Sequence, residues 1–597
     1  MQLTDIYDYI ISMFHHYYGD MIYLVLTVIS AIFLYYTGKK QYRLIVRASV
    51  VLYLFIWNPL FYKFIFSRIV FWRLFWMIPT FLLITLAFAE GLSRLKGGLK
   101  RLILTIICIL VIILFGNNIY KDLYHGEYTD PYRLPNNASL IASAMLEKDD
   151  HPRCILPHDL ISWIRLYSGD IEPLYGRNAE GYINDTSADV DSIYASMNSD
   201  SPDYNYILYY ARLNGYNFVI NNDSKPININ STETFGYELM ANMAGFNIYY
   251  NPNISDEMFS ESDPSYGSEL IHADTGWQLI LPSGELATST VVNIYGYNYY
   301  VNSFGFIIDD LSETDVESFS PDDVIITQYG RDNYGKPSMC YTIDDQHGTF
   351  IVIDGGNPEE AAIVMNTVRM YGNHIDAWIL THPHEDHIGA FNEIYRNCVL
   401  TGELSIDQIY AIDIDPEYYE QIAQPWDNIY IFHDFNSLTA QIDNLTYVQR
   451  GETYSIGNIS FKVYNTFTDE SYNISTGSLP NAATMVLEVF GPEGENGQSM
   501  LFLGDLEQGN ADLIAGIFDD ELHADYVQAA HHGQNIDYDF YELIGASTVA
   551  VDAPAWLRLE NPDTHTAFEH LQWFNEEGLS VLTYDSTPNT IILHTGE

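Results

Sequence analysis

Four side chains of metal-ligand type stand within six residues in the segment His382-Pro-His384-Glu-Asp386-His387. Imidazoles at positions i and i+2 of an extended turn can reach one cation, and the following carboxylate and imidazole can turn toward a neighbouring cation. Imidazole and carboxylate ligands without a thiolate suit Zn²⁺, Mn²⁺ or Fe. Two ions that share a bridging water form a hydrolytic centre. The segment therefore predicts a site for two divalent metal ions, Zn or Mn, rather than a solvated polar loop.

Other chemically capable residues follow strand-like runs in the same part of the chain. Asp354 ends one such run before two glycines, Asp505 ends another, and His531-His532 follow a third. His565 opens a predicted helix. An Asp after a strand is otherwise a turn residue, and a histidine at a helix start is otherwise a cap, so these four positions gain a functional meaning only if they converge on the metal segment.

The apolar pattern predicts the elements that position these residues. We expect strands over 324–328, 340–343, 349–354 and 377–380, and a helix over 358–371. The last strand runs directly into Thr381 and the histidine-rich segment. Since α/β folds place their chemistry on loops at the edge where strands end, this arrangement favours an active site there.

These residues match the HxHxDH signature of the metallo-β-lactamase superfamily. The order of the later motifs resembles, more narrowly, the metallo-hydrolase domain at the end of bacterial competence proteins that take up DNA. Those motifs are Asp354-Gly-Gly, Asn481 to Val489, Met500 to Asp505, Tyr526 to Gly533 and Asn561 to His565. The resemblance covers residues 322–597 and implies an αββα four-layer sandwich with hydrolase activity.

The resemblance also implies a role for each residue of the signature. His382 and His384 hold metal one, and Asp386 and His387 hold metal two. Asp505 bridges both ions through its carboxylate. Asp386 is also assigned to catalysis.

The roles of the later residues follow from the same resemblance. His531 and His532 supply the remaining ligand of metal two, or one ligand and one histidine that contacts a phosphate. The sequence does not distinguish the two. His565 is placed to act as a general acid or an oxyanion donor, and Asp354 is expected to orient the metal loop from behind rather than to bind metal.

The chain departs from the superfamily pattern at one position. Many members have a further histidine between the signature and the bridging Asp, but the only histidine in that interval is His433, which lies in an unrelated context. Asn481 and Thr484 stand in the usual neighbourhood, and Asn481 is expected behind the ligands. Metal one is therefore expected to be weaker or more open than in a β-lactamase.

Residues 1–120 are basic and apolar, with 11 Lys and Arg against 4 Asp and Glu. We expect four transmembrane helices there, at four apolar runs: about Met21–Thr37, Ile45–Phe61, Ile69–Ala89 and Leu102–Phe115. The distribution of positive loops predicts that both termini lie outside, which gives a multi-pass protein of the cell membrane with an extracytoplasmic catalytic domain. The alternative is a buried helical bundle of a soluble protein.

The middle of the chain is predicted in three parts. Residues 121–252 are expected to form a small extracytoplasmic α/β domain, with strands at 204–210, 218–221 and 246–250 and helices at 140–146 and 238–243. Residues 253–275 read as a linker. Residues 276–320 suggest β-hairpins with exposed aromatic rings, similar to the cell-wall-binding repeats of Gram-positive surface proteins. An ordinary hairpin segment that docks onto the next domain is the alternative.

Charge limits the partners. Residues 121–597 hold 15 basic and 75 acidic side chains, a formal charge of −60. Such a surface repels polyanions, so no stable nucleic-acid binding is expected. The membrane is the expected partner, and the expected reaction is hydrolysis of a phosphodiester by a metal-bridged water, either in nucleic acid or in a decoration of cell-wall polymer. The alternatives are an inactive metal-binding scaffold, or a lactonase or thioesterase.

Overall fold

The structure is a computed structural model. It describes residues 10–11, 22–37, 39–58, 77–115, 134–176, 187–273, 275–311, 313–330, 335–424, 427–440, 442–474, 478–559, 565–584 and 588–595. The chain divides into two compact units: Met1–Pro131 with Glu180–Asp185, and Tyr132–Ala179 with Thr186–Glu597. The metal segment lies in the second unit, and each unit is described by itself.

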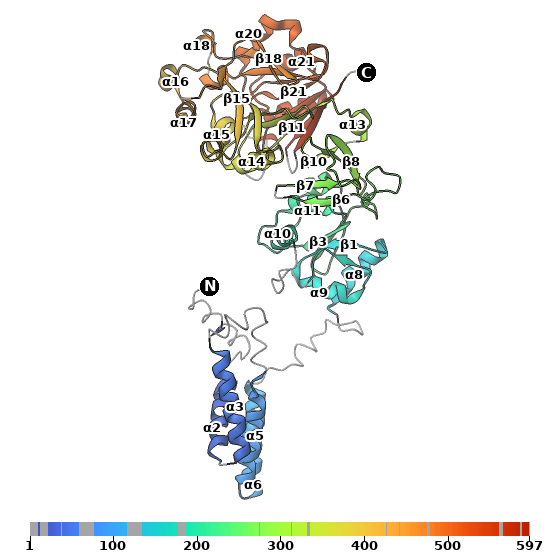
Figure 1. Ribbon diagram of the computed structural model, residues 1–597, viewed down its shortest axis with the longest axis vertical. Coiled ribbons are helices and arrows are strands. Elements are labelled where there is room, and N and C mark those ends of the chain that lie inside the picture. The colour runs from blue at the N-terminus through green and yellow to red at the C-terminus, as the bar shows by residue number, and fades with distance from the viewer. Residues whose placement is uncertain are drawn as a thin grey trace. The chain divides into compact units, whose positions relative to one another are not determined.

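The first unit is helical at the predicted apolar runs. Its helices are α2 (Ile22–Tyr36), α3 (Lys40–Ile56), α5 (Thr80–Arg94) and α6 (Gly98–Phe115), drawn in blue in Figure 1. Helices α2 and α5 pack on each other through Leu34 and Leu83. The unit also contains a buried polar contact: the Glu90 carboxylate accepts hydrogen bonds from Lys39 and Arg94.

The transmembrane prediction is wrong. Within the described residues, no helix combines the length and the apolar character that a membrane crossing requires. Helices α2 and α5 each have 15 residues, which gives about 22 Å at 1.5 Å per residue against about 30 Å for a hydrocarbon core. Part of the third apolar run, residues 69–76, lies outside the described residues. The predictions of a multi-pass membrane location and of an extracytoplasmic catalytic domain depended on these spans, so they are wrong as well.

The second unit begins with a five-stranded sheet in the order β2-β1-β3-β5-β4. Its strands are β1 (Arg153–Ile155), β2 (Glu172–Pro173), β3 (Phe218–Asn222), β4 (Glu238–Met243) and β5 (Phe246–Tyr250). The helices of this part are α8 (Asn136–Lys148), α9 (His158–Tyr167), α10 (Ala188–Met197), α11 (Tyr204–Leu213) and α12 (Ile229–Thr234). Apolar side chains of the helices and of the sheet share one core.

Two secondary-structure predictions in this part are wrong: one predicted strand is a helix, and one predicted helix is a strand. The segment at 204–210 was expected to be a strand but belongs to helix α11, because the Asp203 side chain caps its first turn and its apolar residues recur at helical spacing. The segment at 238–243 was expected to be a helix but is strand β4, which pairs with β5 across the turn Ala244-Gly245. The predictions at 218–221, 246–250 and 140–146 are confirmed by β3, β5 and α8.

A small β region follows. Strands β6 (Glu269–His272) and β7 (Trp277–Ile280) pair, and β8 (Thr290–Ile294), β9 (Tyr297–Val301) and β10 (Ile307–Leu311) form a three-stranded sheet that precedes α13 (Glu313–Ser318). Strand β6 lies inside the predicted linker. The rings of Tyr299 and Tyr300 are completely buried, so the expectation of exposed rings is wrong for them. The Tyr300 hydroxyl donates to the Asp344 carboxylate 2.8 Å away, so this sheet docks onto the following domain.

The last part contains two seven-stranded sheets. The first has the order β16-β15-β14-β13-β12-β11-β24 and the second β17-β18-β19-β20-β21-β22-β23. The strands of the first sheet are β11 (Val324–Gln328), β12 (Cys340–Asp344), β13 (Phe350–Asp354), β14 (His374–Ile379), β15 (Ser405–Ala411), β16 (Leu445–Tyr447) and β24 (Asn589–Leu593). Those of the second are β17 (Thr453–Ile456), β18 (Ile459–Asn465), β19 (Val486–Phe490), β20 (Ser499–Phe502), β21 (Tyr526–Gln528), β22 (Thr548–Val551) and β23 (Ser580–Thr583). The predicted catalytic-domain strands are confirmed by β11 to β14.

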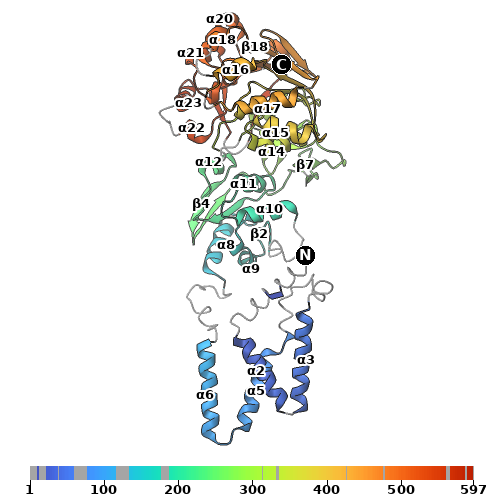
Figure 2. The same cartoon turned by 90° about the vertical axis from the view of Figure 1, so that its left-hand side faces the viewer.

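Helices cover the outer face of each sheet (Figure 1 and Figure 2). Helices α14 (Ala361–Arg369), α15 (Glu385–Ile394) and α17 (Ile429–Thr439) pack on the first sheet around Trp378. Helices α20 (Gln508–Phe518), α21 (Tyr538–Ile544) and α23 (Ala567–Glu576) pack on the second around Val549. Between the sheets, apolar side chains such as Ile353 and Leu487 form a shared core. The four-layer αββα prediction is confirmed for this part.

Candidate metal centre

The candidate centre lies where four strands end. Strands β13 and β14 run parallel in one sheet, and β20 and β21 run parallel in the other. Asp354 closes β13, the histidine-rich segment follows β14, Asp505 follows β20, and the turn with His531 and His532 follows β21. Because the carboxyl ends of parallel neighbours meet at one sheet edge, residues up to 178 positions apart in the sequence come together.

The first ligand group consists of His382, His384 and Asp505. Nε2 of His382 lies 3.1 Å from Nδ1 of His384 and 3.6 Å from Oδ2 of Asp505. One nitrogen or oxygen of each residue lies within 4.8 Å of the others. His382 and Asp505 are buried, and His384 caps helix α15 at the cavity surface.

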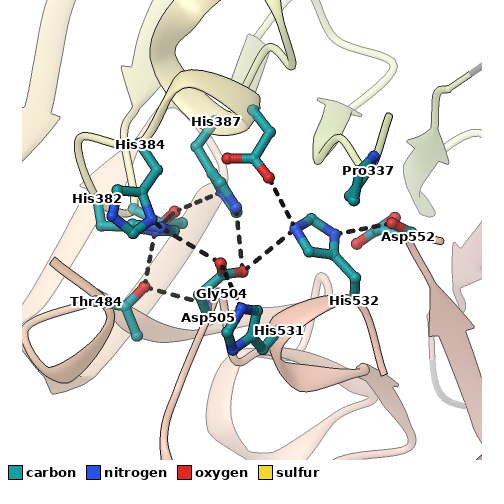
Figure 3. Close-up of polar contacts among 12 residues, drawn as sticks. Pro337, His382, His384, His387, Thr484, Gly504, Asp505, His531, His532 and Asp552 are labelled. Carbon is teal, nitrogen blue, oxygen red and sulfur yellow. Dashed lines mark hydrogen bonds and ion pairs between the residues drawn. The ribbon is translucent and has the colours of Figure 1, made fainter. Parts of the chain in front are cut away.

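The second group consists of Asp386, His387 and His532. Nε2 of His532 lies 3.2 Å from Oδ2 of Asp386, and Nε2 of His387 lies 3.1 Å from Oδ1 of Asp505. Asp505 therefore presents Oδ2 to the first group and Oδ1 to the second, as Figure 3 shows. This is the arrangement that a carboxylate needs to bridge two ions.

The far nitrogen of each ligand imidazole has its own partner. Nδ1 of His387 faces the Asp354 carboxylate at 2.7 Å, and Nδ1 of His532 faces the backbone carbonyl of Asp552 at 2.8 Å. These acceptors hold the proton on Nδ1, which leaves Nε2 free as a ligand. Asp354 also accepts from the Thr381 N–H at 2.7 Å, so one carboxylate anchors both the loop and the ring.

The histidines of the first group are held in the same way from a different part of the chain. Nε2 of His384 lies 3.1 Å from Oδ1 of Asp427 and 3.2 Å from the Ser478 hydroxyl. Nδ1 of His382 lies 3.2 Å from the Thr484 hydroxyl. Nε2 of His382 and Nδ1 of His384, which face each other, therefore remain available to bind a metal ion.

The contacts of two buried atoms at the centre indicate whether the residues can hold metal ions. Nε2 of His387 and Oδ1 of Asp505 are buried and lie 3.1 Å apart as an ion pair, but neither makes a well-aligned hydrogen bond with the described residues. Buried polar atoms in this state keep the capacity to bind an ion. Imidazole and carboxylate without thiolate form the donor set of Zn²⁺, Mn²⁺ or Fe, and the residues fit two such ions.

The electrostatics of the centre favour positive charge. Burial opposes ionisation of Asp505, yet the surrounding imidazoles, His387 first, hold its pKa well below its usual value. Burial likewise lowers the pKa of His387, but the carboxylates of Asp505 and Asp354 outweigh burial and raise it well above its usual value. A cation bound nearby would therefore stabilise the negative charge of the Asp505 and Asp354 carboxylates.

A cavity of about 310 Å³ opens onto the centre. Four of its eleven lining residues are acidic, and one lysine is the only Lys or Arg among them. The lining residues are Lys336, Pro337, Asn357, His384, Glu385, Asp386, Asp427, Asn428, Asn481, Asp505 and His531. A substrate can therefore approach both ligand groups from this side.

The structure separates the roles of the adjacent histidines. His532 belongs to the second ligand group, whereas His531 lines the cavity with Nε2 at 3.7 Å from Oδ2 of Asp505. The Asn535 amide donates to Nδ1 of His531 at 2.8 Å, so a neutral His531 carries its proton on Nε2. Both residues have positive φ angles, 49° and 58°, and Nε2 of His532 lies 3.8 Å from Oδ1 of Asp505.

Two predicted residues take places that the sequence did not specify. His565 bonds through Nδ1 to the Gln534 side chain at 2.7 Å, beside the His531 turn, and does not belong to either ligand group. Asn481 lines the cavity. His433 pairs with Glu420 on the surface at 3.3 Å, away from the centre.

Sequence reasoning missed Asp427, Ser478 and the carbonyl of Asp552. Asp427 lies 43 residues after His384, in a loop before α17. No local pattern marks a polar loop residue as the partner of a particular imidazole, so only the tertiary structure reveals it.

A third group of ligand-type residues lies elsewhere. His374, Asp376 and Asp407 stand on β14 and β15, with Nε2 of His374 at 3.5 Å and 3.6 Å from the two carboxylates. His374 is the first residue of its strand, whereas the candidate centre follows the strand ends. Exposed acidic groups of this kind are common without a metal ion.

A four-layer αββα sandwich with a two-ion ligand set at its strand ends defines a class of metal-dependent proteins. Residues 333–437 match the model of the Metallo-beta-lactamase superfamily. The chain therefore carries a metallo-β-lactamase superfamily domain. No curated protein sequence matches the chain.

Several solved structures are similar to this chain. The metallo-beta-lactamase fold protein YhfI from Bacillus subtilis is 12% identical over 45% of this chain and 100% of its own, with a TM-score of 0.29. A diphosphatase of the PhnP family is 14% identical over 46% and 100%, with a TM-score of 0.28. Unliganded yeast PDE1 is 12% identical over 46% and 99%, with a TM-score of 0.31. At these TM-scores the likenesses carry no functional argument.

Proposed function

We propose that the domain at 322–597 is a metal-dependent hydrolase that cleaves a phosphodiester. The observation that carries the proposal is the convergence of both ligand groups on Asp505, whose Oδ2 lies 3.6 Å from Nε2 of His382 and whose Oδ1 lies 3.1 Å from Nε2 of His387. Two ions bound there would lower the pKa of a water and stabilise negative charge on phosphorus oxygens.

The chain's own residues support the chemistry around the ions. Asp354 and Asp427 hold the rings of His387 and His384, so the ligand atoms need little rearrangement. His531 lines the cavity, where its Nε2–H can donate to a phosphate oxygen or a leaving group. Lys336 at the rim supplies one further positive charge, although it also pairs with Glu359 at 3.0 Å.

We further propose that the substrate is a small or chain-end phosphodiester rather than a long nucleic-acid strand. Recognition of a long strand needs a basic groove with stacking aromatic side chains. The cavity has one lysine, several carboxylates and no aromatic ring other than histidine among its lining residues. The charge of −60 over residues 121–597 also opposes a second polyanionic contact.

The test uses the full chain, stripped of metal and reloaded with Mn²⁺ or Zn²⁺. We expect hydrolysis of bis-p-nitrophenyl phosphate, and we expect Asp386→Ala to lower kcat/KM by more than about 100-fold, because it removes a ligand of the second group. The matched control is Asp407→Ala, which removes a carboxylate of the exposed third group and should leave turnover unchanged.

Each alternative has its own result. Two bound ions without turnover of phosphodiesters, lactones or thioesters would identify a metal-binding scaffold and refute the hydrolase. Turnover of a lactone or thioester alone would refute the phosphodiester. Preference for single-stranded DNA over small diesters, weakened steeply by salt, would refute the proposed substrate size.

A further inference from the structure

The first ligand group has three members, and a fourth residue that lines the same cavity has a side-chain oxygen without a hydrogen bond to the described residues. Oδ1 of Asn481 is buried and has no hydrogen-bond partner within the described residues. The residue as a whole is 4% exposed, and it lines the cavity together with His384 and Asp505. A buried amide oxygen in this state costs free energy unless a ligand completes it.

The segment that carries Asn481 contacts both histidines of the first group. Three residues before it, the Ser478 hydroxyl contacts Nε2 of His384 at 3.2 Å. Three residues after it, the Thr484 hydroxyl contacts Nδ1 of His382 at 3.2 Å. Asn481 therefore stands midway along a segment whose two ends already touch the far nitrogens of both histidines.

The backbone of this segment is fixed independently of any ion. Helix α19 (Leu479–Ala482) is a single turn, and the Thr484 N–H donates to the Asn481 carbonyl at 3.1 Å. The buried Asn465 side chain donates to the carbonyls of Ala482 and Thr484 at 3.3 Å and 2.8 Å. The position of Asn481 is thus set by the fold, and its free oxygen is not a consequence of a loose loop.

We propose that the side-chain oxygen of Asn481 is a ligand of metal one and that it biases this ion toward Mn²⁺ over Zn²⁺. The inference rests on the two-ion centre of the proposed function and differs from the expectation that Asn481 stands behind the ligands. Amide and carboxylate oxygens suit Mn²⁺, whereas a further imidazole suits Zn²⁺. An oxygen at this place makes the first group two nitrogens and two oxygens.

The experiment measures metal binding rather than turnover. The metal-stripped full chain is titrated with Mn²⁺ by calorimetry, bound metal is counted by mass spectrometry, and the magnetically coupled Mn²⁺ pair is followed by electron paramagnetic resonance. We expect the wild type to bind two ions. Asn481→Ala should weaken one of them by more than about 100-fold and abolish the coupled-pair signal.

A second variant separates a ligand from a merely structural residue. Asn481→His keeps a ligand but replaces oxygen by nitrogen, so it should retain two ions and shift the ratio of Mn²⁺ to Zn²⁺ affinity toward Zn²⁺ by at least about tenfold. The control is Asn221→Ala, which removes another buried amide with an unpartnered oxygen, on β3. It should leave both ions and the ratio unchanged.

The outcomes distinguish this inference from the proposed function. If Asn481→Ala binds two Mn²⁺ ions as the wild type does, or if Asn481→His leaves the ratio unchanged, Asn481 is not a ligand even where hydrolysis is robust. If the Asn481 variants change the binding of metal one as expected but no phosphodiester is cleaved, the proposed function is refuted and the assignment of Asn481 as a ligand is supported. A wild type that binds no pair overturns both.

Discussion

At the scale of single residues, the centre depends on what stands behind each ligand. His387 and His384 are backed by carboxylates, His532 by a backbone carbonyl and His382 by a hydroxyl. A carboxylate partner both fixes the tautomer and makes the imidazole a stronger electron donor. The two ligand groups therefore differ in their outer partners as well as in their ligands.

Asp427 offers a direct test of this outer layer. Asp427→Ala removes the acceptor 3.1 Å from Nε2 of His384 and should weaken the affinity for one ion by about 10–100-fold, measured by calorimetry. Asp434→Ala, which removes a surface carboxylate paired with Arg396, should have no effect. Equal affinities in both variants would show that Asp427 does not orient the ligand.

The adjacent histidines should separate binding from turnover. His532→Ala removes a member of the second ligand group and should lower the metal count from two to one. His531→Ala removes a side chain that lines the cavity and should keep both ions while kcat falls by about 100-fold or more. Metal counting and kinetics on the same samples check this, and the reverse pattern would exchange the two roles.

At the scale of elements, the metal loop is held by close packing behind it. Helix α15, which begins inside the signature, lies against the short helix η5 (Pro358–Glu360). Gly389 makes this approach possible, since a Cβ there would lie 2.5 Å from Cδ of Pro358 and 2.9 Å from its backbone nitrogen. The glycine after the signature is thus a packing requirement, and not a flexible joint.

Gly389→Ala should therefore lower the free energy of unfolding by about 1–3 kcal/mol, because η5 must move. Gly516→Ala is the matched control, since Gly516 lies in helix α20 and a Cβ there meets nothing within 4 Å. It should raise the free energy of unfolding by roughly 0.5–1 kcal/mol. Chemical denaturation of both variants checks the pair, and a neutral Gly389→Ala would show that η5 yields freely.

At the scale of the whole molecule, the β8–β10 sheet and the metal domain share buried polar contacts. Tyr300 donates to Asp344, and the Asn302 amide donates to the Met370 carbonyl at 3.0 Å. Burial raises the pKa of Asp344 to about 6, although the Tyr300 hydroxyl and the Gln346 N–H both donate to it. This contact therefore gives the unit a pH dependence that is separate from the metal centre.

The sign of that dependence follows from linkage. Because the pKa of Asp344 is higher in the folded than in the unfolded protein, its stabilising contribution is complete below about pH 4 and is lost as the pH rises through about 6. Asp344→Asn removes the titration, so the variant should match the wild type near pH 4 and exceed it by about 1–3 kcal/mol at pH 7–8. Denaturation at several pH values checks this, and a constant difference would contradict it.

The sequence by itself determined the strands that precede the candidate centre, the four-layer class and the residue types of the candidate ligands. These features are local, because a strand that ends in His-x-His-x-Asp-His or in Asp505 shows both its pattern and its chemistry within a few residues. It also predicted helices at the apolar runs of residues 1–120, but their lengths depend on where each helix ends, and the predicted spans were wrong.

The tertiary structure decided the rest, since those features depend on contacts between distant residues. Strand β4 exists because it pairs with β5, against the helical interpretation of its sequence. Tyr299 and Tyr300 are buried by docking that their own pattern does not show. His532, and not His531, joins the second group because Nε2 of His532 lies 3.2 Å from Oδ2 of Asp386, and the link from Asp427 to His384 spans 43 residues. Local spacing names candidate ligands, whereas only the packed fold gives each one its direction and its partner.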